Sequence, residues 1–365
     1  MSAFALARLI VGVTLLILGA ELLVRGASKL AAMLGISPLI IGLTVVAFGT
    51  SAPELAVGLK AAFVDEADLA IGNAVGSNIF NILFVLGLAA TIAPLTVAQQ
   101  IVRLDVPLMI GASAMLLFLC LDGALEPVDG ALLFAALVGY LWILVRQARR
   151  ESAAVRAEYE RQVGVPARHG KAMILNAGLG VLGLMLLVVG SDWLVLSAVE
   201  IATALGVSSL VIGLTVVAGG TSLPEVATSV VAGMRGERDI AVGNAIGSCI
   251  FNILAVLGLT AMIAPGGIGV PPAAINFDIP FMIAVSVACL PIFFHGHSLE
   301  RWEGGVFLFH YVAYTTYLIL QASRHDALPE FSAVMQWFVV PITALTIVII
   351  GWRGVQQARN ERLHR

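Results

Sequence analysis

Two glutamates lie deep inside long apolar segments, where a carboxylate is energetically costly. Glu54 stands in a segment spanning 38–63, and Glu225 stands in one spanning 209–234. An acid at the centre of a membrane helix costs roughly 2.5–3.5 kcal/mol on insertion scales, so it needs a partner. No Lys or Arg adjoins either acid in the sequence. Two such acids in equivalent settings therefore predict a bound cation rather than a structural ion pair.

Oxygen-bearing side chains accompany each acid at helical spacing. Thr50 and Ser51 lie four and three residues before Glu54, so a helix would place them near it on one face. The candidate oxygen ligands are Glu54, Thr50, Ser51, Ser77 and Asn81 in the first half, and Glu225, Thr221, Ser222, Ser248 and Asn252 in the second. Hard oxygens suit Na⁺ and also Ca²⁺, which takes about six to eight of them. The lack of soft ligands argues against copper or zinc.

A proline precedes each acid and loosens the helix around it. Pro53 and Pro224 lack the backbone N–H that a helix needs, and the ring clashes with the carbonyl four residues back. That carbonyl belongs to Gly49 in one segment and to Gly220 in the other. Inside a membrane, a freed carbonyl is tolerated only where it lines a polar cavity or finds another partner. These segments are therefore predicted to offer backbone oxygen to a cation.

The two acids belong to two copies of one sequence. Residues 39–88 align with 210–259 at a constant offset of 171, with 32 of 50 positions identical and no gap. The motifs GLTVVAFGTSAPE and GNAVGSNIFNILFVLG of the first copy correspond to GLTVVAGGTSLPE and GNAIGSCIFNILAVLG of the second. A weaker match pairs Glu21 with Asp192. Such duplication is typical of secondary transporters, whose binding site lies where the copies meet.

The composition is that of an integral membrane protein. Hydrophobic residues fill 59% of the 365 positions and charged residues 12%, with a mean hydropathy of +1.00. Soluble domains have about 45–50% apolar and about 25% charged residues. Cys120, Cys249 and Cys289 all lie in apolar runs without the spacing of a zinc site, so we expect small buried residues. The first apolar run lacks a basic leader and a cleavage site, which favours a membrane helix over a signal peptide.

Apolar runs of about 20 residues, long enough to cross a bilayer, recur along the whole chain. They predict an all-α polytopic fold with ten core helices in two five-helix repeats and one C-terminal helix. The predicted helices are 3–33, 38–63, 69–93, 102–122, 128–147, 171–204, 209–234, 240–263, 274–295, 303–322 and 331–352. The predicted organisation is a first repeat at 1–147, a basic cytoplasmic loop at 148–170, a second repeat at 171–322, and an extra helix with a basic tail at 323–365.

The basic residues predict an orientation. With the N-terminus outside, 17 of the 20 Lys and Arg residues face the cytoplasm, and only Arg8, Lys60 and Arg324 face outward. This distribution follows the positive-inside rule and places the C-terminus in the cytoplasm. Five helices separate equivalent positions of the two copies. Because five is odd, the copies are predicted to cross the membrane in opposite directions, as an inverted-topology repeat.

The two blocks resemble the α-repeats of the calcium/cation antiporter superfamily, specifically its bacterial sodium/calcium exchanger branch. The resemblance rests on Gly-Thr-Ser-x-Pro-Glu and Gly-Asn-x-x-Gly-Ser and covers the first ten helices. It implies a calcium/sodium antiporter of the bacterial inner (plasma) membrane, with Ca²⁺ and Na⁺ as transported ions and no cofactor. No nucleic acid and no obligatory protein partner are expected, so a monomer would suffice. The long first and sixth helices would slide as a gate against the rest.

The resemblance also implies a division of ligands. Glu54 and Glu225 would bind calcium together with the carbonyls of Thr50 and Thr221. The sodium sites would be completed by Ser51, Ser77, Ser222 and Ser248, with the carbonyls of Ala47 and Ala218.

One position departs from the family pattern and leaves the counter-ion open. Sodium/calcium exchangers commonly carry an Asp in the second repeat opposite Asn81, whereas this chain has Asn252. Two carboxylates remain, and their charge balances one calcium ion. Sites with two Asn residues also resemble the proton/calcium branch, so a proton is the alternative to sodium, while the Thr-Ser-x-Pro-Glu motif favours sodium.

Hypotheses of other classes fit the sequence less well. A cation channel would conduct without a counter-ion on the opposite face, so gradient dependence separates it from an antiporter. A non-transporting scaffold does not explain an acidic, oxygen-rich interior. An enzyme is not expected, because the sequence holds no nucleophile–base set and no cofactor motif.

Several other features remain without an assigned role. Glu21 and Asp192 could face a cavity, cap a helix or bond at an interface. Asn73 and Asn244 could be ligands or packing residues. His295 and His297 are expected to be ordinary loop histidines. Gly178, Gly180 and Gly183 match a dinucleotide fingerprint by spacing, but no strand precedes them, so they are expected to serve packing.

Overall fold

The computed structural model describes residues 3–63, 67–150, 170–206, 219–294, 296–344 and 348. In the first half, with η denoting a π-helical segment, the elements are α1 (Ala3–Leu34), α2 (Pro38–Ile41), η1 (Gly42–Val46), α3 (Ala47–Thr50), α4 (Ala52–Phe63), α5 (Ala67–Phe80), η2 (Asn81–Leu86), α6 (Gly87–Ile92), β1 (Leu95–Thr96), η3 (Ile101–Asp105), α7 (Val106–Leu119), β2 (Ala124–Leu125) and α8 (Pro127–Arg150). In the second half they are α10 (Gly170–Ala204), α12 (Leu223–Met234), α13 (Arg238–Phe251), η5 (Asn252–Leu257), α14 (Gly258–Ile263), β3 (Ile268–Gly269), η6 (Ala274–Asp278), α15 (Ile279–Phe294), β4 (Ser298–Leu299), α16 (Arg301–Ala322), α17 (Leu328–Val334) and η7 (Met335–Val339).

The chain is a mostly helical, multi-pass membrane protein. Within the described residues, seven helices are long and apolar enough to cross a membrane. An eighth is added if the bent pair Pro38–Thr50 and Ala52–Phe63 counts as one span. The predicted seventh and eleventh helices fall partly outside the described residues, at 207–218 and beyond 344. The total of eleven spans therefore stays a prediction.

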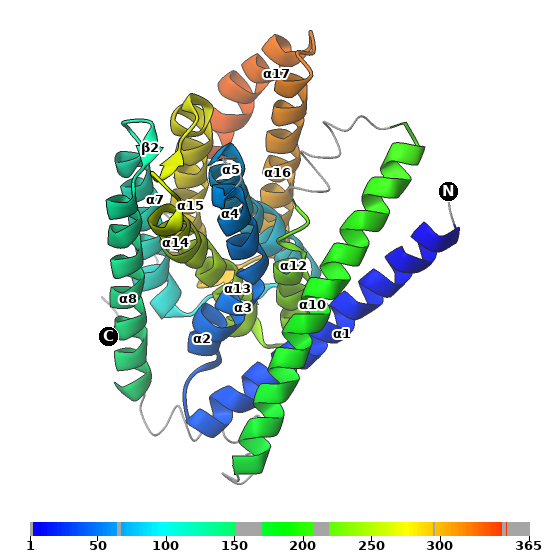
Figure 1. Ribbon diagram of the computed structural model, residues 1–365, viewed down its shortest axis with the longest axis vertical. Helices are drawn as coiled ribbons and strands as arrows, with labels where there is room; N and C mark the ends of the chain where they lie inside the picture. The colour runs from blue at the N-terminus through cyan, green and yellow to red at the C-terminus, as the bar shows by residue number, and fades with distance from the viewer. Residues whose placement is uncertain are drawn as a thin grey trace.

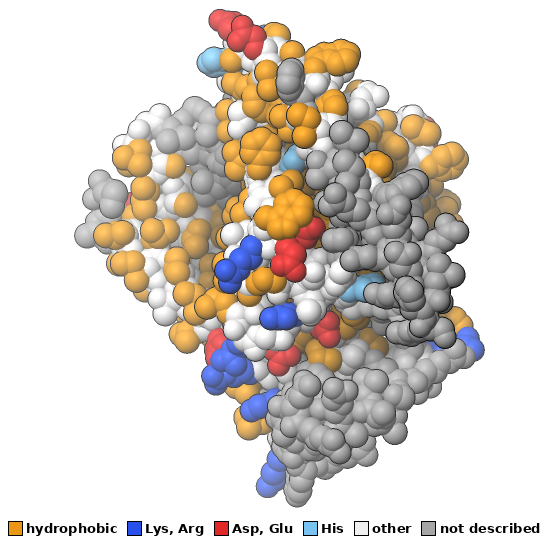
Figure 2. All heavy atoms as spheres, turned by 180° about the vertical axis from the view of Figure 1, so that it is seen from behind, with side chains coloured by type: hydrophobic (Ala, Val, Ile, Leu, Met, Phe, Trp, Pro, Cys, Tyr) orange, Lys and Arg blue, Asp and Glu red, His pale blue; other side chains and the backbone are white. Residues whose placement is uncertain are grey.

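The outer surface is largely apolar, as a bilayer requires. Large hydrophobic side chains of α1 such as Phe4, Ile10 and Ile17 are more than half exposed. Figure 2 shows broad hydrophobic areas on one face, with Lys, Arg, Asp and Glu gathered mainly in its lower half. An apolar outer surface of this kind suits contact with lipid.

The repeated segments form the centre of the molecule. Among the candidate spans in the described residues, Arg238–Ile263, which contains α13, is the most buried, with 83% of its most apolar stretch inside the protein, and Leu69–Ile92 follows with 72%. By contrast, only 22% of the corresponding stretch of α10 is buried. Figure 1 shows α13 among the other helices, with α1 and α10 as an obliquely crossing pair at one flank. The predicted long helices are thus peripheral, and the predicted ligand-bearing helices are central.

Both central spans depart from α-helical winding at the same repeated residue. η2 begins at Asn81 and η5 begins at Asn252, and each returns to an α-helix six residues later. A π-helical segment widens the turn and is frequent at functional sites. The sequence predicted continuous helices here and gave no sign of this local change in winding.

The helix that carries each acid begins just before its proline. Ser51 (φ −81°, ψ 4°) and Ser222 (φ −91°, ψ 8°) both leave helical geometry, and α4 and α12 begin at the next residue. In the first half the two parts meet at 42°. The interruption follows from Pro53 and Pro224, which cannot donate the hydrogen bond that would continue the helix.

Two short strand pairs join loops of the two halves. β1 pairs antiparallel with β4, and β2 pairs antiparallel with β3. Each pair therefore contains one strand from each half of the chain. These two-residue bridges were not predicted from the sequence, because strands this short leave no recognisable periodicity.

Candidate cation site

Each buried glutamate is hydrogen-bonded by serines from both halves of the chain. Ser222 Oγ lies 2.9 Å from Glu54 Oε1, and Ser77 Oγ lies 3.4 Å from the same oxygen. Ser248 Oγ and Ser51 Oγ lie 3.3 and 3.4 Å from Glu225 Oε1. The contacts are reciprocal, because each acid meets one serine of its own half and one of the other. These contacts gather the two acids into one polar cluster at the boundary between the halves, formed by α4, α5, α12 and α13 and by the serines that directly precede α4 and α12.

This crossing differs from the contact expected within one helix. Helical spacing alone placed Ser51 beside Glu54, whereas the structure directs its hydroxyl to Glu225. The helix is broken at Ser51, so residues on either side of it no longer share one helical face. The break thus turns a local pair into a contact between the two halves.

The threonines and the undecided asparagines complete the reciprocal pattern. Thr50 Oγ1 donates to Asn244 Oδ1 at 3.0 Å, and Thr221 Oγ1 donates to Asn73 Oδ1 at 3.3 Å. The amide nitrogens of Asn73 and Asn244 in turn donate to the backbone carbonyls of Glu54 and Glu225, at 3.2 and 3.3 Å. Both asparagines therefore brace the backbone that carries the acids. Their equivalent positions in the repeat were the signal that could have assigned this role.

Several oxygen atoms at the site have no hydrogen-bond partner among the described residues. Glu54 and Glu225 are both 0% exposed, and the second carboxylate oxygen of each lacks a partner. Asn81 lacks a partner at both amide atoms, and so does Asn252 at Oδ1. A buried polar atom without a partner costs about 1–3 kcal/mol, and more if it is charged. The oxygens among these atoms, but not the Asn81 amide nitrogen, are the ones expected to bind a cation.

No basic side chain compensates the two acids within the described part of the chain. Its ion pairs join Arg8 to Glu200, and Arg25 and Arg235 to Glu21. Glu54 and Glu225 take part in none of them. Among the described residues, no three His, Cys, Asp or Glu side chains lie close enough together to hold a metal ion by themselves. Any cation here would therefore complete its coordination with hydroxyl, amide and carbonyl oxygens.

The backbone carbonyls that were predicted as ligands differ in the contacts that they make. The Ala47 carbonyl faces Thr50 Oγ1 at 3.3 Å and Ser248 Oγ at 3.5 Å, so it lies within the polar cluster. The Gly220 carbonyl accepts a hydrogen bond from Ser191 Oγ at 2.6 Å, so it has found a protein partner. Ala218 lies outside the described residues.

A second polar contact beside the acids was missed in the sequence. Asn78 Nδ2 donates to the Cys249 carbonyl at 3.1 Å, and Asn252 Nδ2 donates to Asn78 Oδ1 at 3.2 Å. Asn78 and Cys249 occupy equivalent positions of the repeat but differ in type, so comparison of the copies did not select them. Through Asn78, the asparagine of η5 is tied to the first half of the chain.

The other singled-out residues lie away from this cluster. Glu21 bonds to Arg25 and Arg235. His297 adopts φ +50° in the loop before β4, where its carbonyl accepts from Val97 N at 2.8 Å, and His295 lies outside the described residues. The cysteines are buried, as expected. Of the three glycines expected to serve packing, Gly183 lies against the backbone of α1, whereas a Cβ on Gly178 or Gly180 would meet nothing within 4 Å.

Known proteins share both the sequence and the fold of this chain. A family model described as "Sodium/calcium exchanger protein" matches residues 4–146 and 175–320. The chain is 41% identical over 310 residues to "Putative antiporter CaxA" of Alkalimonas amylolytica, covering 84% of this chain and 95% of that protein. It is 44% identical over 286 residues to "Inner membrane protein YrbG" of Escherichia coli (strain K12), covering 78% and 86%.

Two further relatives carry the name of an exchanger. "Sodium/calcium exchanger MaX1" of Methanosarcina acetivorans is 30% identical over 341 residues, covering 85% of this chain and 97% of that protein. A solved structure of the sodium-calcium exchanger NCX_Mj matches with a TM-score of 0.73 and 29% identity, covering 88% of this chain and 99% of that one. The family match extends over both halves of the chain, and each half supplies one of the buried acids. The protein therefore belongs to the sodium/calcium exchanger family.

Proposed function

We propose that the protein is a secondary antiporter that exchanges Ca²⁺ for Na⁺ across a bacterial inner membrane. The observation that carries this proposal is the pair of fully buried acids, Glu54 and Glu225, each with one carboxylate oxygen that no described residue satisfies. Two negative charges in an apolar protein require positive charge, and the described surroundings supply only neutral oxygens. Membership of the exchanger family, and the names of MaX1 and NCX_Mj, support calcium and sodium as the ions.

The ligands of calcium would come from both halves of the chain. Glu54 and Glu225 would supply the charge, and the carbonyls of Thr50 and Thr221 would add neutral oxygen. Calcium prefers such oxygen-rich, carboxylate-containing sites. The two charges balance one Ca²⁺, so the loaded site carries no net charge and avoids the penalty of an uncompensated buried charge.

The sodium ligands would overlap with those of calcium. They would include the hydroxyls of Ser51, Ser77, Ser222 and Ser248, with the carbonyls of Ala47 and Ala218. The hydrogen bonds from these serines to the acids support this overlap. Ions that share ligands compete, and competition at a shared site is what couples the two fluxes without a leak.

We further propose that the two halves form an inverted repeat that exposes this site alternately to each side. The reciprocal contacts of the acids and the crossed strand pairs support a two-fold relation. The peripheral pair α1 and α10 would slide against the central helices to change access. The N-terminus would lie outside and the C-terminus in the cytoplasm, as the basic residues predict.

A proton is the alternative counter-ion, and the residue type at one repeated position supports this alternative. Asn81 and Asn252 begin equivalent π-helical segments, so neither half offers a third carboxylate at this position. Uptake of radioactive calcium into proteoliposomes separates the two ions. An outward sodium gradient should drive uptake at uniform pH, and an outward proton gradient without sodium should not. Uptake that requires the proton gradient and ignores sodium would replace sodium by the proton.

A further inference from the structure

α1 and α10 are packed so closely that they form one unit, which we call the α1–α10 pair. Gly12, Gly19 and Gly26 lie seven residues apart on α1, and a Cβ at each would lie within 2.9 Å of an α10 backbone atom. Gly183 and Gly190 of α10 approach α1 in the same way, at 2.6 and 2.8 Å. Backbones in direct contact leave no room for one helix to shift past the other, so the two are expected to move together.

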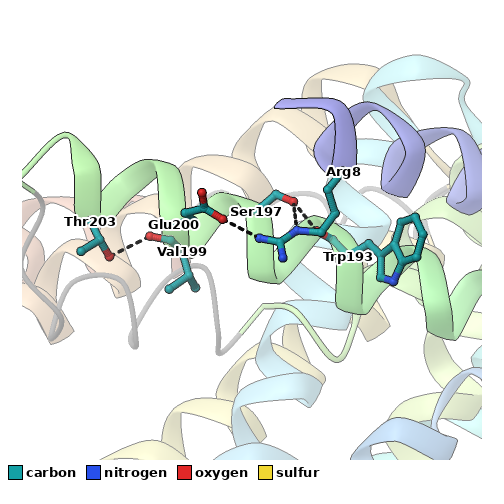
Figure 3. A network of polar contacts seen from close by, with 6 residues as sticks. All are labelled: Arg8, Trp193, Ser197, Val199, Glu200 and Thr203. Carbon is teal, nitrogen blue, oxygen red and sulfur yellow. Dashed lines mark hydrogen bonds and ion pairs between the residues drawn. The ribbon is translucent and has the colours of Figure 1, made fainter. Parts of the chain in front are cut away.

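An ion pair strengthens the α1–α10 pair near the N-terminus of α1. Figure 3 shows the Arg8 side chain of α1 reaching across to Ser197 and Glu200 of α10. Arg8 Nε lies 2.9 Å from Ser197 Oγ, and a terminal guanidinium nitrogen lies 2.9 Å from Glu200 Oε2. This ion pair adds a second contact between two helices that are expected to move as one.

A different set of contacts ties the α1–α10 pair to the central helices. Glu21 of α1 accepts hydrogen bonds from the Arg235 guanidinium, in the turn between α12 and α13, and also pairs with Arg25 at 2.7 Å. Two turns further along α1, Ser28 Oγ donates to Glu237 Oε1 of the same turn at 2.6 Å. Two side chains of α1 thus bind the turn that directly follows the helix carrying Glu225.

Within the described residues, which leave out the equivalent loop at 64–66, this connection is found on one side of the repeat. The equivalent of Glu21 is Asp192 on α10, which is exposed and has no hydrogen bond or ion pair within the described residues. The repeat explains the difference, because the positions equivalent to Arg235 and Arg25 hold Val64 and Leu196. The sequence therefore provides Glu21 with two arginine partners, whereas the positions equivalent to those arginines offer Asp192 no basic side chain.

We propose that Glu21–Arg235 and Ser28–Glu237 form a latch that holds the α1–α10 pair in one of the two access states and opens once in every transport cycle. This inference rests on the proposed antiport by alternating access. Any sliding of the α1–α10 pair along the central helices must separate Glu21 from Arg235, whereas it leaves Arg8 and Glu200 together. The asymmetry biases an otherwise two-fold related carrier toward the latched state.

Reversible crosslinking tests the latch on a transporting protein. Glu21 and Arg235 are 25% and 34% exposed, so E21C and R235C can be joined by a short reducible bis-methanethiosulfonate, while the three native cysteines are buried. The matched control joins R8C to E200C, within the α1–α10 pair. We expect the first crosslink to lower calcium exchange at least tenfold and dithiothreitol to restore it, and the control crosslink to leave exchange unchanged. The latch proposal would be wrong if calcium exchange were undiminished when positions 21 and 235 are crosslinked. It would also be wrong if the control crosslink caused an equal loss.

Equilibrium variants test the bias separately. Because the latch is partly exposed, E21Q or R235Q should change the ratio of calcium half-saturation on the two membrane sides by roughly two- to fivefold. The double variant should shift this ratio no further than one single variant, since both remove the same bond. D192N removes the equivalent acid and should not shift it. A shift with D192N, or none with E21Q and R235Q, contradicts the proposal, and a wild type without any exchange would instead refute the antiport itself.

Discussion

The Ser222 hydroxyl donates a hydrogen bond to Glu54 across 2.9 Å, so a serine of one half of the chain contacts the acid of the other. Ser51 makes the reciprocal contact with Glu225 at 3.4 Å. Ser222 lies three residues before Glu225, and Ser51 lies three residues before Glu54. Each acid is therefore hydrogen-bonded by a serine from the segment that carries the other acid. A change at either acid is expected to reach the whole site, and the predictions below depend on that relation.

Removing either carboxylate should abolish calcium transport. E54Q and E225Q keep the size of the side chain but leave one negative charge, which cannot balance Ca²⁺ in a buried site. We expect a loss of at least 100-fold in calcium uptake and in calcium binding by the purified protein. E330Q, at an exposed position of α17, is the matched control and should transport normally. Normal uptake by E54Q or E225Q would refute the site.

The two crossing serines should have equivalent roles. S222A removes the 2.9 Å donor to Glu54, and S51A removes the 3.4 Å donor to Glu225. A hydrogen bond to a charged group contributes about 1.5–3 kcal/mol, so the half-saturation concentration for sodium should change by roughly tenfold or more. Sodium titration of calcium uptake measures it. The serine assignment fails if both variants keep the wild-type sodium dependence.

Glycines of α10 should differ sharply in their tolerance of alanine. A Cβ on Gly183 would lie 2.6 Å from Leu23 N of α1, whereas a Cβ on Gly178 meets nothing within 4 Å. Overpacking costs about 1–3 kcal/mol, so G183A should lower the thermal unfolding midpoint in detergent by several degrees. G178A should leave it unchanged or raise it, because alanine favours a helix. Equal midpoints for the two variants would contradict the close packing of the α1–α10 pair.

A fully buried tyrosine–aspartate contact should stabilise the protein more than a similar contact that is less buried. Tyr140 donates to fully buried Asp105 at 3.0 Å, and Tyr314 donates to half-buried Asp278 at the same distance. Y140F leaves a buried acid with one donor fewer, a loss of about 1–3 kcal/mol, whereas water can reach Asp278 in Y314F. Denaturation in detergent should therefore show the larger loss for Y140F. A larger loss for Y314F would contradict the burial argument.

Sequence reasoning located the acids and their surroundings because a duplicated, costly residue leaves a strong signal. Glu54, Ser77 and Asn81 recur at a fixed offset, and a carboxylate in an apolar run has few structural explanations. The helix interruptions followed from Pro53 and Pro224. These features depend on local chemistry, which a sequence displays directly.

What the sequence did not reveal depends on contacts between distant segments. The crossing of Ser51 to Glu225 required knowledge of how the two halves meet. The π-helical segments at Asn81 and Asn252 could not be read from the sequence, because the same residues are compatible with an α-helix. Asn78 and Cys249 were overlooked because the copies differ there, and Glu21 gained its role only through Arg235, over 200 positions away.

Competition between the two ions at equilibrium tests the central claim most directly. Binding of radioactive calcium to the purified protein should weaken as sodium is raised, with a steeper than first-order dependence because more than one Na⁺ replaces one Ca²⁺. Potassium at the same ionic strength controls for screening. Calcium binding that sodium and potassium weaken equally would contradict a site at Glu54 and Glu225 that the two ions share.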